Sequence, residues 1–161
     1  MKKYLLIISS GLLLTSMIGC NKHFGNNFNE GASISSADDL PVNPLHEKVI
    51  TSTIHPADTT MSTLYANDIA WKYALSHNDF NYPAGAELYE VTWRQKPDSV
   101  WFGANIPEKI MMVECLTFTN AELPTYTSYG GHPLKKIVNN NSGYIEGRIK
   151  EIVPQRMAIA P

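Results

Sequence analysis

The spacing between the apolar segments is the feature that most constrains how this chain can fold. The segments that join successive strand-like runs in the middle of the chain, residues 94–99 and 105–109, are very short. A parallel crossover needs a dozen or more residues, whereas an antiparallel connection needs as few as two. The strands are therefore predicted to pair in an antiparallel way.

The local patterns predict strands mixed with two helices. Runs rich in β-branched and aromatic residues predict five strands, over residues 48–54, 59–65, 87–93, 100–104 and 110–118. Asn67 is expected to cap a helix over residues 68–76, and Ser142 to cap a second helix that Pro154 ends. Residues 121–141 are expected to be irregular. The predicted fold class is α+β, a mostly antiparallel sheet packed by helices.

The first twenty residues have the layout of an export signal. Lys2 and Lys3 precede an apolar stretch, residues 4–16, which Ser and Thr interrupt too often for a stable membrane span. Met17-Ile18-Gly19-Cys20 resembles the bacterial lipobox, in which the cysteine receives a lipid. This resemblance implies palmitate-type lipidation at Cys20. An ordinary secretory peptide that happens to end near a cysteine is the alternative interpretation.

The lipobox also implies a location and a division of the chain. The mature protein is expected in the cell envelope of a bacterium, facing the periplasm, and Asn21 after the cysteine favours the outer membrane. Residues 1–19 are predicted to be the signal peptide and residues 20–44, rich in Asn, Gly and Ser, a flexible tether. Residues 45–161 are predicted to form one domain.

Charge and cysteine content exclude several classes of function. The net charge of −2 becomes −4 without Lys2 and Lys3, and basic residues are scattered, so no nucleic-acid partner is predicted. With Cys20 lipidated, Cys115 has no disulfide partner, and its apolar surroundings favour a core position over a reactive thiol.

Four blocks of sequence resemble the cytochrome P-460 domain family: residues 60–68, 82–88, 91–93 and 101–107, with a similar ending over residues 148–161. The resemblance covers roughly residues 47–161 and implies a cytochrome P-460-like sheet. Haem-bearing members attach haem through a Cys-x-x-Cys-His motif. That motif is missing here, because neither Cys20 nor Cys115 belongs to one, so covalent c-type attachment is excluded. The family's lysine cross-link to haem cannot be assigned to a residue here.

The candidate site residues come from the local sequence around one histidine and from this resemblance. His132 lies between glycines and proline, and Trp93, Trp101 and Phe102 are candidates to line a haem or ligand pocket. Core packing of the aromatic residues and a surface position for the histidine are the alternatives. No catalytic residue and no metal site are predicted, since the histidines are scattered and Glu87 and Glu90 fall on opposite strand faces.

Three functional hypotheses remain. The first is a ligand-binding or structural envelope lipoprotein without covalent haem, and without a predicted cofactor or enzymatic activity. The second is a redox protein that binds haem non-covalently, with His132 as an axial ligand. The third is an interaction module within an envelope protein complex.

Overall fold

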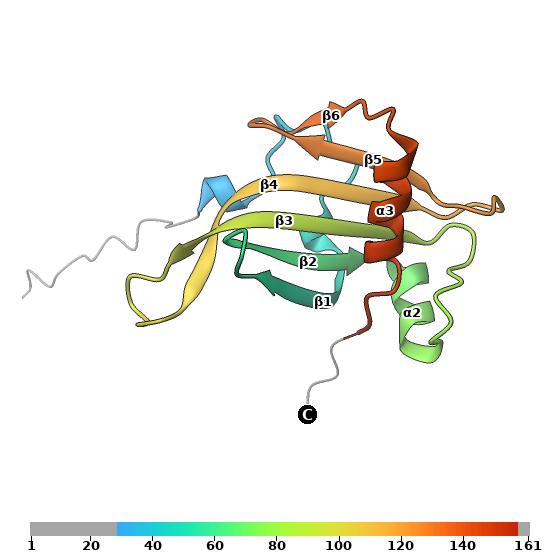
Figure 1. The fold of residues 1–161 in the computed structure, drawn as a ribbon, viewed down its shortest axis with the longest axis horizontal. Helices are drawn as coiled ribbons and strands as arrows, with labels where there is room; N and C mark the ends of the chain where they lie inside the picture. Colours follow the sequence, from blue (N-terminus) through green and yellow to red (C-terminus); the bar gives the residue numbers. More distant parts are fainter. Residues whose placement is uncertain (1–28, 158–161) are drawn as a thin grey trace, which may run out of the picture.

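The apolar and β-branched segments pair in chain order into one antiparallel sheet (Figure 1). The structure is a computed structural model that describes residues 29–157. Its strands are β1 (Lys48–His55), β2 (Thr60–Ala66), β3 (Glu87–Pro97), β4 (Asn105–Thr117), β5 (Thr125–Gly130) and β6 (Lys135–Ile137). The helices are α2 (Asp68–Ser76) and α3 (Ser142–Ile152). The α+β class and the antiparallel pairing are confirmed.

The predicted strand over residues 100–104 is wrong. These residues form the loop at the tip of the β3–β4 hairpin, and the strand that returns from it, β4, begins at Asn105. The Asp98 carboxylate accepts hydrogen bonds from the backbone amides of Val100 and Trp101, and Gly103 has a φ of +81°. This turn chemistry breaks the extended conformation that the apolar run favours.

Strands β5 and β6 lie where the sequence predicts irregular structure. Glycine and proline in this stretch do mark turns, but they flank short runs such as Thr125–Gly130 that are rich in Thr and Tyr. The exposed edge of β4 supplies hydrogen-bond partners for β5, which in turn pairs with β6. Pairing to an existing sheet thus converts a segment with weak local signals into strand.

Both helices begin at an asparagine cap. The side chain of Asn67 accepts a hydrogen bond from the Ala70 amide at 3.0 Å, and α2 has the predicted bounds. The cap of α3 is Asn141, whose side chain accepts from the Tyr144 amide at 3.1 Å, so the predicted cap, Ser142, is wrong by one position. Pro154 follows the end of α3, as expected.

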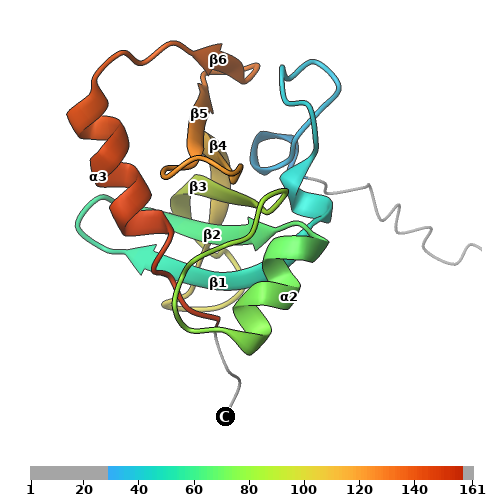
Figure 2. The same cartoon turned by 90° about the vertical axis from the view of Figure 1, so that its right-hand side faces the viewer.

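The sheet buries apolar side chains on both faces. One cluster joins residues such as Leu64, Leu88 and Leu116 to α2 and to the buried Ile149 and Ile152 of α3. The other, around Val91, Trp93, Val113, Tyr129 and Leu134, lies under the segment that precedes β1. Figure 2 shows α3 and this N-terminal segment on opposite sides of the sheet.

The segment over residues 29–44, expected to be a flexible tether, packs on the sheet. It includes two 3-10 turns, η2 (Glu30–Ala32) and the start of η3 (Pro44–His46). The indole nitrogen of Trp93 donates to the Ala32 carbonyl at 3.0 Å, and Asp38 accepts from the Leu134 amide at 2.7 Å. Although the segment is mostly polar, its few apolar side chains, among them Ile34 and Leu40, cover the second cluster.

The predicted signal peptide, Cys20 and residues 21–28 lie outside the described residues. Between residues 29 and 157, no helix is both long and apolar enough to span a membrane.

Candidate functional site

Two carboxylates face each other in the middle of the sheet. Glu90 of β3 and Glu114 of β4 are direct cross-strand partners, and their residues are 4% and 2% exposed. They lie on the face that α3 crosses, which they share with Leu88 and Leu116. Two like charges directly opposite each other destabilise a sheet, and burial strengthens their repulsion, so this arrangement needs a compensating cation.

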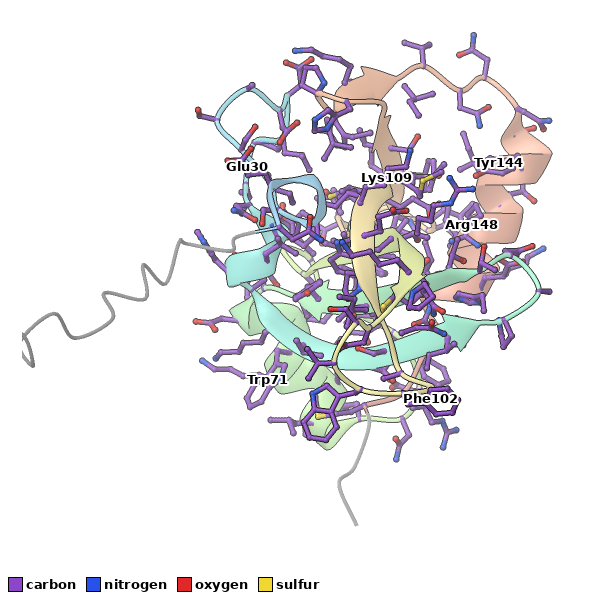
Figure 3. All side chains as sticks on the ribbon, turned by 90° about the vertical axis from the view of Figure 1, so that its left-hand side faces the viewer. Glu30, Trp71, Phe102, Lys109, Tyr144 and Arg148 are labelled. Atoms are coloured by element: carbon purple, nitrogen blue, oxygen red, sulfur yellow. The ribbon has the colours of Figure 1, made fainter. Side chains whose placement is uncertain are left out.

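Arg148 of α3 supplies that cation (Figure 3). Its Nη2 atom donates to Glu90 Oε2 at 2.6 Å and to Glu114 Oε2 at 2.7 Å, while Nε donates to Glu114 Oε1 at 2.8 Å. Its Nη1 atom contacts Glu151 one turn along the helix. The guanidinium therefore forms a bidentate pair with Glu114, through two of its nitrogens, and links β3 and β4 to α3.

Two neutral side chains complete the network. The Tyr126 hydroxyl of β5 donates to Glu114 Oε1 at 2.6 Å, and Gln155 Nε2 donates to Glu90 Oε1 at 2.8 Å. All four carboxylate oxygens of the buried pair thus accept at least one hydrogen bond. In the described part of the chain, no buried side-chain nitrogen or oxygen lacks a partner.

The network carries more negative than positive charge. Two buried carboxylates share one guanidinium, and the third acid, Glu151, is largely exposed. The hydrogen bond to Glu114 raises the pKa of Arg148, and burial opposes this effect only in part. Burial first, and then the hydrogen bond to Glu114, raises the pKa of Tyr126. The guanidinium and the phenol therefore both keep their protons, and the network sets three carboxyl groups against one guanidinium.

A polar cleft of about 570 Å³ opens beside this network. Its volume falls within the range of small-molecule sites, roughly 300–1,000 Å³. Strands β1, β2 and β3 contribute hydroxyl groups to its lining, and the charged groups come from β3, the β1–β2 turn and α3. The lining side chains are Thr53, His55, Asp58, Thr60, Ser62, Glu90, Thr92, Arg148, Glu151 and Gln155. Three of these are carboxylates and one is an arginine, so the cleft is acidic.

The cleft also contains a serine hydrogen-bonded to a histidine. His55 Nε2 and Ser62 Oγ lie 3.1 Å apart, the distance expected for a nucleophile and its base. Ser62 is buried within β2, however, and among residues 29–157 no acid hydrogen-bonds the other ring nitrogen of His55. The geometry is that of a cross-strand hydrogen bond and lacks the third group of a catalytic triad.

An aromatic cavity of about 400 Å³ lies between α2 and the segment after α3. Tyr73 and His77 stack in its wall with ring centroids 4.1 Å apart, and Arg156 lies over the ring of Phe80. Gln155 borders both this cavity and the polar cleft. The hydrogen bond to Asp79 raises the pKa of Tyr73 to about 12, so this phenol stays neutral.

The structure does not bring the four predicted pocket residues together. Trp93 belongs to the second core cluster, whereas Trp101 and Phe102 lie exposed in the β3–β4 loop. His132 follows β5 and borders a separate cavity of about 390 Å³ with Met111 and Lys109. These four residues therefore do not line one common cavity.

Cys115 lies half-buried on β4, opposite Tyr89. Burial raises the pKa of its thiol to about 11, which suits a packing role. Within the described residues, no group of three or more His, Cys, Asp and Glu side chains is placed to hold a metal ion.

The Glu90–Glu114–Arg148 network was not predicted from the sequence. Glu87 and Glu90 were predicted to lie on opposite faces of a strand, and they do, since Glu87 accepts from Tyr89 on the other face. The available signal was Glu114, a single acid inside the apolar run 110–118. An acid at such a position needs a partner, which the register of β3 then supplies.

Comparisons with known proteins add no family. No protein family model matches the chain, and a search of curated proteins finds no relative. The cytochrome P-460 resemblance and non-covalent haem binding therefore stay predictions. The absorption spectrum of reduced protein, produced with haem supplied, tests the haem hypothesis, since a missing Soret band contradicts it.

Proposed function

We propose that this domain binds a small, hydrophilic and positively charged ligand in the polar cleft beside Glu90. The observation that carries the proposal is the charge imbalance: two buried carboxylates share one guanidinium, and of these three groups Glu90 and Arg148 line an open cleft. Burying an ion pair is costly, and replacing it with apolar residues often stabilises a protein. An excess buried negative charge beside an open cleft favours recognition of a cation over a purely structural role.

The cleft offers complementary groups for such a ligand. Asp58 and Glu151 lie exposed among its lining residues and can meet an ammonium group without losing all of their water. Thr53 and Thr60 present hydroxyls on neighbouring strands, which suit a ligand with several hydroxyl groups. The ligand class is therefore an amine that also carries hydroxyls, such as an amino sugar.

We infer further that the domain is held at the bacterial cell envelope by a lipid on Cys20 and faces the periplasm. The support is the sequence alone: a charged start, an apolar stretch and Gly19-Cys20 in lipobox spacing. Diacyl attachment with a third acyl chain exceeds the two hydrophobic signals that stable anchoring requires. The cytochrome P-460-like fold remains part of this proposal, supported by the order of Tyr65, the helix capped by Asn67 and the turn at Gly85.

Calorimetric titration of the full chain with two probes tests the ligand proposal. Glucosamine carries an ammonium group, and N-acetylglucosamine has nearly the same shape without the charge. We expect binding of glucosamine and about tenfold weaker binding of the acetylated sugar, the loss that corresponds to one charged hydrogen bond. Equal affinities, or no binding of either probe, would contradict the proposal.

A matched pair of variants locates the binding. Glu151→Gln removes a carboxylate at the cleft, whereas Glu146→Gln removes an exposed carboxylate of the same helix that does not line it. We expect glucosamine affinity to fall in E151Q and to stay unchanged in E146Q.

The lipid anchor has a separate test: radiolabelled palmitate should enter the wild type and not Cys20→Ala.

A further inference from the structure

Three consecutive large apolar residues project from the tip of the β3–β4 hairpin. Val100 and Trp101 are 80% and 70% exposed, and Phe102 is fully exposed. Figure 1 shows the β3–β4 hairpin extending beyond the other strands, and Figure 3, which looks onto this end of the molecule, labels Phe102 in its loop. Contiguous exposed apolar groups on a soluble domain mark an interaction site.

The loop is built to hold these side chains outward. The Asp98 carboxylate accepts from the amides of Val100 and Trp101 at 2.7 and 3.3 Å, and the Asp98 amide donates to the Ala104 carbonyl at 2.9 Å. Gly103 closes the turn with a φ of +81°. The loop that carries the apolar tip is thus ordered by its own hydrogen bonds and turn.

The start of the described chain lies beside the same hairpin. Asn29 donates through its side-chain amide to the carbonyls of Pro107 and Glu108, at 2.9 and 3.0 Å. Figure 1 shows η2 and the hairpin tip at one end of the sheet. Phe102 precedes Pro107 by five residues, which span at most about 17 Å even if the chain were fully extended. The described chain therefore begins, at Asn29, beside a part of the hairpin that lies within about 17 Å of the tip.

The length of the connecting chain keeps this end near the membrane. Cys20 and Asn29 are nine residues apart, which corresponds to at most about 32 Å of extended chain. This maximum length of about 32 Å is greater than the distance of about 17 Å by which the tip extends beyond the contact of Asn29 with the hairpin. With a lipid on Cys20, the tip can therefore touch the membrane surface in which that lipid is inserted. Tethering also raises the effective concentration of the tip at that surface, so weak insertion suffices.

We propose that the Val100–Trp101–Phe102 tip inserts into the interface of the membrane that carries the lipid anchor and so fixes the orientation of the domain. Trp and Phe favour the boundary between headgroups and acyl chains. The arms of the hairpin carry three cationic side chains, Arg94, Lys96 and Lys109, against the acids Asp98 and Glu108, although the whole chain is net negative. This inference rests on the proposed lipidation of Cys20.

Quenching of tryptophan fluorescence by brominated lipid tests the inference. The lipidated full chain is reconstituted into vesicles of phosphatidylglycerol and phosphatidylcholine, with bromine on the acyl chains close to the headgroup. We expect quenching and a blue shift of the emission in the wild type, and loss of both in Trp101→Phe. Trp71→Phe, on α2, should leave the quenching unchanged.

A second pair of variants separates the tip from general apolar exposure. Phe102→Ser should reduce the quenching of Trp101, whereas Leu123→Ser, an exposed apolar residue in the β4–β5 connection, should not. All four variants change exposed or partly exposed side chains, and circular dichroism checks that each chain is folded.

Two outcomes would overturn the inference in distinguishable ways. If the mass of the chain shows the lipid and the emission of Trp101 is not quenched, the tip does not enter the membrane, while the anchor stands. A tip that docks on a protein gives this result. If the mass shows no lipid on Cys20, the anchor fails and the inference falls with it.

Discussion

Arg148 holds together two carboxylates that the register of β3 and β4 places directly opposite each other. Arg148→Met keeps much of the side-chain volume but leaves Glu90 and Glu114 buried without a counter-charge. We expect a loss of about 3–5 kcal/mol in the free energy of unfolding, the usual effect of breaking a buried ion pair from one side. Urea unfolding at neutral pH measures it.

A neighbouring position provides the control for this prediction. Lys150 is exposed on α3, and Lys150→Met should change stability by less than about 0.5 kcal/mol. Similar losses in R148M and K150M would indicate that the buried network contributes little.

Cys115 gives a pH prediction at the scale of one residue. Burial raises the pKa of its thiol from 9.0 to about 11, so at pH 8 the folded chain has about a hundredth of the thiolate of the unfolded chain. Alkylation by iodoacetamide, followed on the Cys115 peptide by mass spectrometry, should be slower by a similar factor in native protein than in urea.

The pH profile separates a raised pKa from restricted access to the thiol. Between about pH 9 and 11 the native rate should still rise about tenfold per pH unit, whereas the unfolded chain levels off. Because the neutral thiol is favoured by folding, its contribution to stability is full below about pH 9 and is lost as pH rises towards 11. Parallel pH profiles would show that access alone protects the thiol.

At this scale the sequence predicted the surroundings of individual residues better than the contacts between residues that are distant in the chain. It placed Cys115 in an apolar strand and separated Glu87 from Glu90 by strand alternation. It could not pair Glu90 with Glu114 or bring Arg148 to them, because these contacts depend on the β3–β4 register and on where α3 crosses the sheet. Both are tertiary features that no local pattern encodes.

The two helix caps differ in what they connect, and this difference predicts different stabilities. Asn67 accepts from the amides of Ala70 and Glu87 and donates to the Gly85 carbonyl, so it fixes both the start of α2 and the entry to β3. The side chain of Asn141 accepts from the Tyr144 amide alone among the described contacts. We expect about 1 kcal/mol of destabilisation for Asn141→Ala and at least twice that for Asn67→Ala.

Thermal or urea unfolding of the two variants checks this prediction, and hydrogen exchange locates the effect. In N67A the amides at the start of β3 should lose protection together with those of α2. Equal losses of stability in N67A and N141A would mean that the hydrogen bonds to Gly85 and Glu87 add nothing to the cap.

Helices and strands with strong local sequence patterns were predicted. Those that form only by pairing with, or packing on, another part of the sheet were not. The α2 helix and strands β1, β2 and β3 follow from capping, β-branched runs and alternation. The apolar run at residues 100–104 was wrongly predicted to be a strand. Apolar runs usually indicate buried strands, but this run is exposed in a loop. Strands β5 and β6 needed the edge of β4, and residues 29–44 needed the second face of the sheet.

In the whole molecule, the meander order leaves β1 and β6 as the two edges of the sheet. An edge strand offers unpaired backbone groups to a second copy, and proteins protect such edges with short strands and lysines. Strand β6 has three residues, Lys135, Lys136 and the exposed Ile137, and the exposed Val138 follows it. The two lysines are therefore expected to prevent association between copies of the sheet.

Lys136→Val tests this role of the edge. It extends the apolar run at residues 137–138 and removes a charge, so sedimentation should show species that grow with protein concentration, which the wild type should lack. Lys136→Gln separates the two effects, since it removes the charge without adding β-branched surface and should associate less. Lys150→Gln removes the same charge from α3, away from the sheet edges, and should behave as the wild type does. Association of all three variants to the same extent would attribute the effect to net charge, because a change of net charge alone can alter solubility without any pairing of strands.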